Sequence, residues 1–108
     1  MFLKINNQKI EIKIARTFKE KLYGLMGKTN FNYGMLFDNC NAIHTYFMKE
    51  NIDIIGLDNE NRVIYKYENL PKNQIIKINH PLHETSILEL PQGLGKEIIM
   101  NEKIKFDG

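Results

Sequence analysis

Hydrophobic and polar residues alternate strictly over residues 8–14, where every second position from 10 to 14 is isoleucine and the others are glutamine, lysine or glutamate. This two-residue period predicts a β-strand with one buried face. Asn6 and Asn7 precede it, and asparagine tolerates the positive φ of a two-residue hairpin turn. The pattern therefore predicts a hairpin that places Leu3 opposite Ile10, with the apolar residues of both arms on one side.

The next segment changes from an alternating to a helical pattern. Thr17 and Glu20 have the spacing of a capping box, in which each side chain accepts the other residue's amide. Apolar residues then recur near helical spacing as far as Leu25, and Gly24 or Gly27 supplies the left-handed stop. The sequence predicts a helix of about two turns here.

From Gly34 onward the chain again shows short apolar runs separated by polar turns. They predict strands at residues 52–57, 62–67, 74–78 and 85–90, a helical turn within 93–100, and a final strand around Ile104 and Phe106. Many short strands with turn signals favour a closed or barrel-like sheet over a parallel, doubly wound one. We expect an α+β fold with a mostly antiparallel, barrel-like sheet and one or two short helices.

Composition narrows the class of protein. A chain of 108 residues fits one domain spanning residues 1–108. Its net charge of +2 arises from interspersed basic and acidic residues, so we expect no nucleic-acid partner. No run approaches the ~18 apolar residues of a membrane span, residues 1–7 lack a signal-peptide pattern, and the one cysteine excludes an intrachain disulfide. We expect a cytoplasmic protein with no membrane partner.

Four short motifs occur in order along the chain. They are Gly24-Leu25-Met26-Gly27, Gly34-Met35-Leu36-Phe37, His44-Thr45-Tyr46-Phe47-Met48 and Leu88-Glu89-Leu90-Pro91-Gln92-Gly93. Together they resemble an uncharacterised prokaryotic family, the domain-of-unknown-function family 192, over residues 8–106. The resemblance implies a compact β-barrel-like domain with short helices, and it implies no reaction, because the family has none established.

The same resemblance points to His44, Thr45, Met48 and Asp53 as the central motif. This chain has Phe47 where many relatives have tryptophan, and it lacks the proline that often precedes the acid. Relatives also often carry an N-terminal export or anchor segment. The resemblance therefore assigns these residues to one motif without defining the shape of a pocket.

Two acidic residues interrupt apolar strand patterns. Asp53 lies among isoleucines in a run that is apolar on both faces, and a buried carboxylate needs a partner. His44, Lys49, Arg16 and backbone amides are the candidate partners. Glu89 lies between Leu88 and Leu90 in the last motif. Each acid is interpreted either as part of a polar pocket or as a structural group paired with a neighbour.

Metal binding and nucleophilic catalysis have weaker patterns. Cys40, His44, His80 and His83 equal the number of ligands of a tetrahedral zinc site, but they lack the close ligand pairs that mark such sites. Cys40 and His44 could also form a thiol–imidazole pair oriented by Asp53, although they lie in a predicted loop. We expect no metal and no cofactor.

The leading hypothesis is a small non-enzymatic binding or accessory domain with a pocket near His44, Asp53 and Glu89, completed by Thr45 and Met48. Its ligand is an unidentified small molecule or protein. The alternatives are a hydrolase-type enzyme that uses His44 with Asp53, or a weak metal-binding protein. No phosphate-binding loop, dinucleotide motif or nucleophile elbow accompanies these residues.

Overall fold

The computed structural model describes residues 1–17, 25, 27–46, 48–78 and 85–108. The strands are β1 (Phe2–Ile5), β2 (Gln8–Ile14), β3 (Tyr33–Phe37), β4 (Ala42–His44), β5 (Ile52–Leu57), β6 (Val63–Leu70), β7 (Ile75–Lys77), β8 (Ser86–Pro91) and β9 (Phe106–Asp107). One 3-10 helix, η1 (Leu94–Glu97), follows β8. β4 forms in a segment that the sequence predicted to be a loop.

The N-terminal hairpin has the predicted turn and register. Asn6 and Asn7 adopt φ values of 49° and 67°, and Leu3 lies opposite Ile10. The apolar face of β2 is buried at Ile12, while its lysines and its glutamate are exposed. The alternating pattern and the turn residues therefore specify this hairpin locally, as the sequence indicated.

Most strands join one sheet of seven, in the order β6-β5-β8-β3-β2-β1-β9. Its pairs are antiparallel except β2 with β3, which run parallel. The predicted barrel-like closure was wrong: β6 and β9 remain at opposite edges of the sheet. The C-terminal segment instead crosses between the edges, pairing Lys103 with Arg62 and Phe106 with Leu3. The short final strand is too limited to complete a ladder with β6.

The described part of the chain contains little helix. The predicted α+β class therefore fits this fold only loosely, and a mostly-β class describes it better. The predicted turn within residues 93–100 is present as η1, and Gly27 has the left-handed φ of 74° expected of a stop residue. The helix predicted after Thr17 lies outside the described residues. No helix in the described part of the chain is long and apolar enough to cross a membrane.

Each face of the large sheet packs on its own group of apolar side chains. The first core cluster contains Leu3, Ile5, Ile12, Leu36, Ile55, Leu57, Val63, Leu88, Leu90 and Ile98. The second contains Ala15, Leu25, Met35, Phe37, Met48, Ile52, Ile54, Leu70, Ile78 and Ile87. Neighbouring residues of β3, β5 and β8 divide between the clusters because successive side chains of a strand point to opposite faces.

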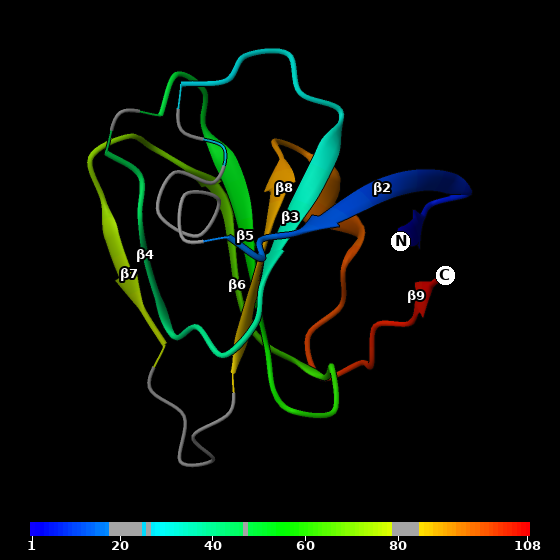
Figure 1. Cartoon of the computed structure of the whole chain (residues 1–108). Helices are drawn as coiled ribbons and strands as arrows, with labels where there is room; N and C mark the ends of the chain where they lie inside the picture. Colours follow the sequence, from blue (N-terminus) through cyan, green and yellow to red (C-terminus); the bar gives the residue numbers. More distant parts are fainter. Residues whose placement is uncertain (18–24, 26, 47, 79–84) are drawn as a thin grey trace.

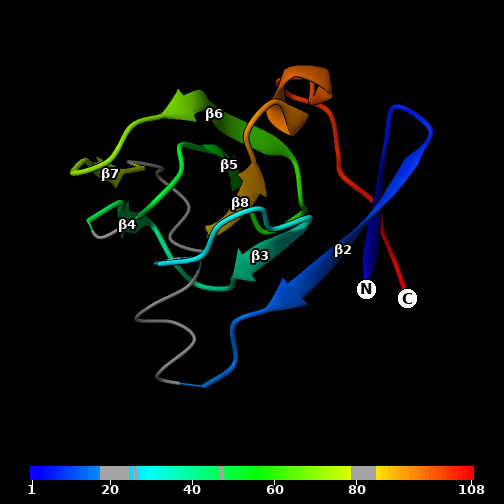
Figure 2. The ribbon, with the colours of Figure 1, turned by 90° about the horizontal axis from the view of Figure 1, so that it is seen from above.

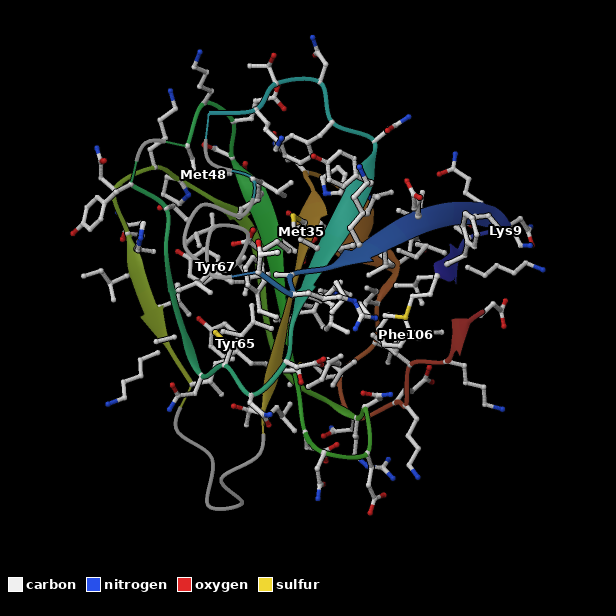
Figure 3. The ribbon with its side chains drawn as sticks, viewed as in Figure 1. Lys9, Met35, Met48, Tyr65, Tyr67 and Phe106 are labelled. Carbon is white, nitrogen blue, oxygen red and sulfur yellow. The ribbon has the colours of Figure 1, made fainter. Side chains whose placement is uncertain are left out.

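A separate two-stranded ribbon of β4 and β7 lies beside the second core cluster (Figure 1). Ile43 and Ile76 attach the ribbon to that cluster. Figure 2 shows the ribbon at one end of the molecule and the β1–β2 hairpin, with both termini, at the other. Figure 3 shows the same division: Tyr65 and Tyr67 lie toward the ribbon, and Phe106 lies toward the termini.

Gly34 lies where three strands approach too closely for a side chain. A Cβ built on it would lie 2.9 Å from the Glu89 backbone oxygen and 2.9 Å from the side chains of Ile12 and Leu90. The backbone oxygen cannot move without disturbing the β3–β8 ladder. The glycine that opens the second motif is therefore a packing requirement of the sheet.

We predict that Gly34→Ala lowers the free energy of unfolding by about 1–3 kcal/mol, the usual cost of overpacking a core. Urea denaturation followed by circular dichroism measures the change. Gly108→Ala is the control, because a Cβ at that position meets nothing within 4 Å. A Gly34→Ala midpoint equal to that of the unmodified chain would contradict this packing argument.

Candidate functional site

Asp53 is buried, with 1% of its surface exposed, and it points into the face of the sheet that carries the first core cluster. Its Oδ1 accepts a hydrogen bond of 2.7 Å from the Asn69 amide. Its Oδ2 accepts bonds of 2.8 Å from the amides of Gly93 and Gly95. The predicted burial is confirmed, and among the four predicted partners it is backbone amides that bind the carboxylate.

These three bonds fasten two segments to β5: the end of β6 and the turn that leads into η1. The turn depends on glycine. Gly93 has φ 98°, which side-chain-bearing residues rarely adopt, and a Cβ on Gly95 would lie 3.0 Å from Asp53 Oδ2. The Asp53 carboxylate therefore needs glycine at positions 93 and 95, and the turn needs the carboxylate as its acceptor. This arrangement is typical of a structural anchor rather than of an open catalytic acid.

We predict that Asp53→Ala lowers the free energy of unfolding by about 3–5 kcal/mol, since it leaves buried amides without their charged acceptor. Asp53→Asn keeps the shape and one acceptor oxygen, so it should cost less. Chemical denaturation measures both. Asp38→Ala, at an exposed acid, is the control and should stay within about 0.5 kcal/mol of the unmodified chain. An Asp53→Ala change that small would disprove the anchor.

Glu89 points into the opposite face of the sheet. It lies on β8 between Met35 of β3 and Ile54 of β5, which are its partners in the two antiparallel ladders and belong to the second core cluster. Only 5% of its surface is exposed. The backbone amide of Leu25 hydrogen-bonds the carboxyl group, but Oε1 has no hydrogen-bond partner among the described residues.

This environment favours the neutral acid. Burial raises the pKa of Glu89 from 4.5 to about 8, although the hydrogen bond from the Leu25 amide lowers it in part. At neutral pH the group is therefore a protonated carboxyl that can donate as well as accept a hydrogen bond. A buried polar oxygen without a partner is uncommon in a folded protein and marks a place where a further group would be stabilising.

The raised pKa of Glu89 makes stability pH-dependent. Between pH 4.5 and about 8 the folded chain binds more protons at Glu89 than the unfolded chain. Its full contribution to stability is thus present below pH 4.5 and is lost as the pH rises through about 8. We predict that Glu89→Gln, which stays neutral, loses less stability than the unmodified chain between pH 5 and pH 9, as measured by denaturation at each pH.

The unmodified chain and Glu89→Gln share every other titrating group. The difference between them in the slope of unfolding free energy against pH therefore reports on Glu89 alone. Equal slopes would mean that Glu89 is ionised in the folded state. Carbon NMR of the Glu89 carboxyl provides an independent measurement, with a titration expected near pH 8.

Thr45 is a structural residue of the ribbon. Its hydroxyl donates a bond of 2.8 Å to the Pro71 carbonyl and accepts one of 2.8 Å from the Gln74 amide. Its own amide donates to the Gln74 carbonyl at 2.9 Å. Thr45 is 1% exposed, so these bonds satisfy its polar atoms and fix the segment before β7 against the end of β4.

His44 and Met48 flank Thr45 and point in different directions. His44 is exposed at the end of β4, on the face of the ribbon opposite to Ile43, and its ring lies 5.4 Å from that of Tyr46. Met48 is 6% exposed and belongs to the second core cluster. The motif therefore places the aromatic rings of His44 and Tyr46 on the surface and the Met48 thioether in the core.

The structure groups the candidate site residues unevenly. Met48 and Glu89 share the face of the sheet that carries the second core cluster, Thr45 braces the ribbon beside it, and His44 lies on the outer surface of the ribbon. Asp53 lies on the other face of the sheet. His44 and Asp53 are thus not brought together, and whether any of these residues binds a ligand stays a prediction.

Cys40 forms hydrogen bonds to its own loop and to Thr85. Its Sγ donates to the Ala42 carbonyl at 3.1 Å, and its carbonyl accepts the Thr85 hydroxyl at 3.1 Å. Across the described residues, no three histidine, cysteine or acidic side chains gather closely enough to hold a metal ion. His80 and His83 lie outside the described residues.

Sequence reasoning named backbone amides as candidate partners of Asp53 without identifying them, and it missed the backbone donor to Glu89. The amides of Gly93 and Gly95 bind Asp53, and the amide of Leu25 binds Glu89. A signal was available: each donor lies in or beside one of the glycine-containing motifs. The glycines were interpreted as turn and stop residues, whereas they also bring a backbone amide to a buried carboxyl group.

Comparisons with known proteins agree with this fold and supply no reaction. The sequence profile of the domain-of-unknown-function family 192, described as an uncharacterized ACR, matches residues 1–106. A UPF0127 protein of Thermococcus sibiricus is 41% identical over 59 residues, which are 49% of this chain and 38% of that protein. A UPF0127 protein of Thermococcus kodakarensis is 38% identical over 60 residues, which are 50% of this chain and 38% of that protein. The matches thus span well under half of either relative.

Two solved structures share the fold. A protein of unknown function from Novosphingobium aromaticivorans superposes with a TM-score of 0.78 at 21% identity, covering 97% of this chain and 82% of that one. A putative transcription regulator from Sinorhizobium meliloti has a TM-score of 0.73 at 18% identity, covering 99% of this chain and 90% of that one. At these identities the likeness concerns the fold alone.

Proposed function

We propose that this chain, which belongs to the domain-of-unknown-function family 192, is a small non-enzymatic binding domain that takes a compact, mainly apolar ligand at Glu89. The observation that carries the proposal is Oε1 of Glu89, a residue that is 5% exposed: this oxygen has no hydrogen-bond partner among the described residues. Apolar surroundings with a few convergent polar groups are the usual form of a small-ligand site.

The chemistry of Glu89 narrows the ligand class. A protonated carboxyl donates a hydrogen bond through its hydroxyl, so it favours a ligand with an acceptor oxygen, such as a ketone, amide or ether. Met35 and Ile54 on either side favour apolar surface around that oxygen. An anionic ligand is disfavoured, because the described surroundings of Glu89 are apolar and supply no paired cation, and such an environment penalises charge.

The other candidate residues have supporting roles in this proposal. Met48 belongs to the apolar cluster of the same face and can adapt its shape to a ligand. Thr45 holds the ribbon in place, and His44 with Tyr46 forms an exposed aromatic pair on its outer side. Asp53 acts from the opposite face by fixing β5 to its neighbours.

The hydrolase alternative needs His44 and Asp53 in one catalytic pair, within hydrogen-bond reach of each other. Asp53 already accepts three backbone hydrogen bonds on the face of the sheet opposite to the ribbon. His44 is exposed and lies against Tyr46. Because this geometry supplies neither a free base nor an orienting acid for His44, binding is the better-supported function.

We predict that cyclohexanone, a compact apolar molecule with one acceptor oxygen, binds at Glu89 at pH 6 and more weakly at pH 9, where the carboxyl group ionises. NMR titration of the backbone amides on β3, β5 and β8 measures the affinity. Glu89→Gln retains a donor and should retain binding, whereas Glu89→Leu should lose it.

Methylenecyclohexane, a neutral molecule of the same shape without an acceptor oxygen, is the control ligand and should bind more weakly at pH 6. Equal cyclohexanone affinity in Glu89→Leu and the unmodified chain would rule out the proposed site. Hydrolysis of cyclohexyl acetate that disappears in His44→Ala would favour the enzyme instead.

A further inference from the structure

The β4–β7 ribbon has one buried face and one exposed face. Ile43 and Ile76 attach its inner face to the second core cluster. On the other face Ile75 has 66% of its surface exposed, more than any other large apolar side chain among the described residues. It lies opposite His44, whose ring is 5.4 Å from that of Tyr46. We name the side of the ribbon that carries His44 and Ile75 its outer face.

β7 also presents backbone groups along its edge. Its partner in the ribbon is β4, and Figure 1 shows β7 outside β4, at the margin of the molecule. The Thr45 amide bonds the Gln74 carbonyl in this ladder, and bonded and non-bonded pairs alternate in antiparallel strands. The N–H and C=O groups of Ile75 and Lys77 therefore point outward, and nothing in the described part of the chain bonds to them. Such an edge is a template for a further strand.

The charge of the ribbon has one sign. Residues 39–49 and 69–78, which contain both strands, include Lys49, Lys72 and Lys77 and no acidic residue. The whole chain has a net charge of +2, so the remainder carries a net negative charge. No described residue forms an ion pair with these three lysines. Lys77 is exposed on the outer face with Ile75, because alternate residues of a strand share a face. Charge complementarity therefore favours an acidic partner at this edge.

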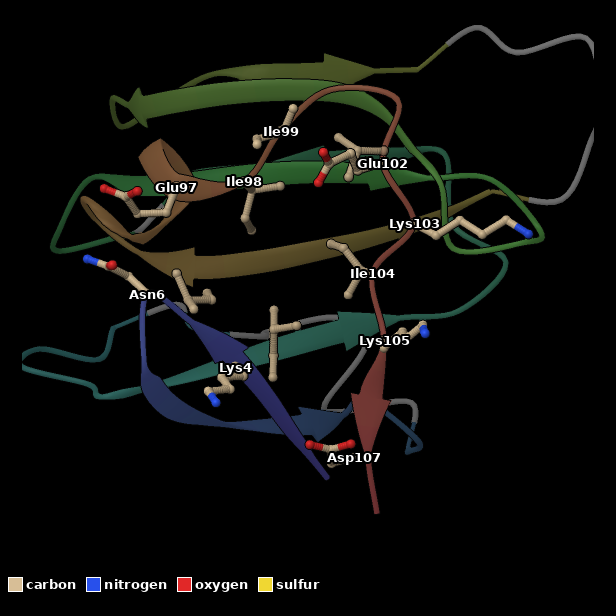
Figure 4. A pocket seen from close by; sticks show the side chains of 13 residues that line it. Lys4, Asn6, Glu97, Ile98, Ile99, Glu102, Lys103, Ile104, Lys105 and Asp107 are labelled. Atoms are coloured by element: carbon tan, nitrogen blue, oxygen red, sulfur yellow. The ribbon is translucent and has the colours of Figure 1, made fainter.

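The hollow between the N-terminal hairpin and the C-terminal segment has no such preference (Figure 4). Its volume is about 470 Å³, and its lining carries charged side chains of both signs, namely Lys4, Glu97, Glu102, Lys103, Lys105 and Asp107. Mixed charges select neither a cation nor an anion. The ribbon combines one sign of charge with an open strand edge, so the chemistry of its partner is defined more closely.

We propose that the outer edge of β7 binds an extended acidic segment of a partner protein, which joins the ribbon as an antiparallel third strand. The segment residues opposite Ile75 and Lys77 exchange backbone hydrogen bonds with them and share the outer face. The residue against Ile75 is apolar, and the residue against Lys77, two positions away, is acidic. Lys72 favours a second acid on the other side of the apolar residue.

The same observations disfavour other occupants of this edge. A second copy of the chain would bring only the same lysines, and lysine on an edge strand opposes self-pairing. A lipid headgroup or a nucleic acid could pair with the lysines, but neither supplies the alternating donors and acceptors that the edge groups of Ile75 and Lys77 need. The site is separate from Glu89 and does not rest on the function proposed for it.

The test uses the acetylated and amidated peptide Thr-Glu-Thr-Val-Thr-Glu-Thr, in which valine has a glutamate two positions away on each side. One control peptide has lysine in place of both glutamates. A second control has N-methylvaline, which lacks the N–H that would bond Ile75. NMR titration of the backbone amides should show the acidic peptide shifting Ile75 and Lys77. Both controls should bind about five- to tenfold more weakly, and raised salt should weaken the acidic peptide.

Lys77→Glu should reverse the preference between the acidic peptide and the lysine peptide. Lys105→Glu, at an exposed position in the C-terminal segment, changes the net charge by the same amount and should leave the preference unchanged. The proposal is overturned if the lysine peptide binds the unmodified chain as tightly as the acidic one, or if Lys77→Glu leaves the preference unchanged. It is also overturned if N-methylvaline has no effect, because strand addition requires that N–H.

Two further measurements address the other occupants. Shifts of the Ile75 and Lys77 amides that grow with protein concentration, without binding of the acidic peptide, would assign the edge to a second copy of the chain. Binding to phosphatidylserine vesicles, again without binding of the acidic peptide, would assign it to a lipid surface. Either result would overturn the proposal.

Discussion

The carboxylate of Asp53 is the interaction on which the arrangement of this chain depends. It brings together three segments distant in sequence: β5, the end of β6 and the turn before η1. A buried carboxylate is tolerated only when its oxygens are satisfied, and here backbone amides satisfy them. Because one of these amides is that of Gly93, the last motif is coupled to the acid of the central motif.

The sheet holds two buried acids on opposite faces, and each has a different environment. Asp53 accepts three amide hydrogen bonds and serves as an anchor. Among the described residues, Glu89 receives one, from the Leu25 amide, and burial raises its pKa to about 8. The number of donors around each carboxyl separates the structural acid from the candidate binding acid, although both lie in apolar strands.

Incomplete closure of the sheet has consequences at its edges. A longer β9 would continue its ladder along β1 and fill the wedge between Ile5 and Ile104. Instead, the C-terminal segment is divided between two partners, β1 and the segment before β6, and a cleft remains. At the other end of the molecule, the ribbon fixed by Thr45 packs beside the second core cluster.

Local sequence determined the elements whose information is local. The Asn6-Asn7 turn, the face of β2 that is buried and the burial of Asp53 all followed from residue spacing, because side-chain alternation and turn conformation act over a few residues. The motifs also identified the family. Tertiary structure alone decided the parallel pairing of β2 with β3, the open sheet, and the placement of Asp53 and Glu89 on opposite faces. Those features depend on contacts between distant segments, and the pattern of a single strand does not specify which segment will supply its partners.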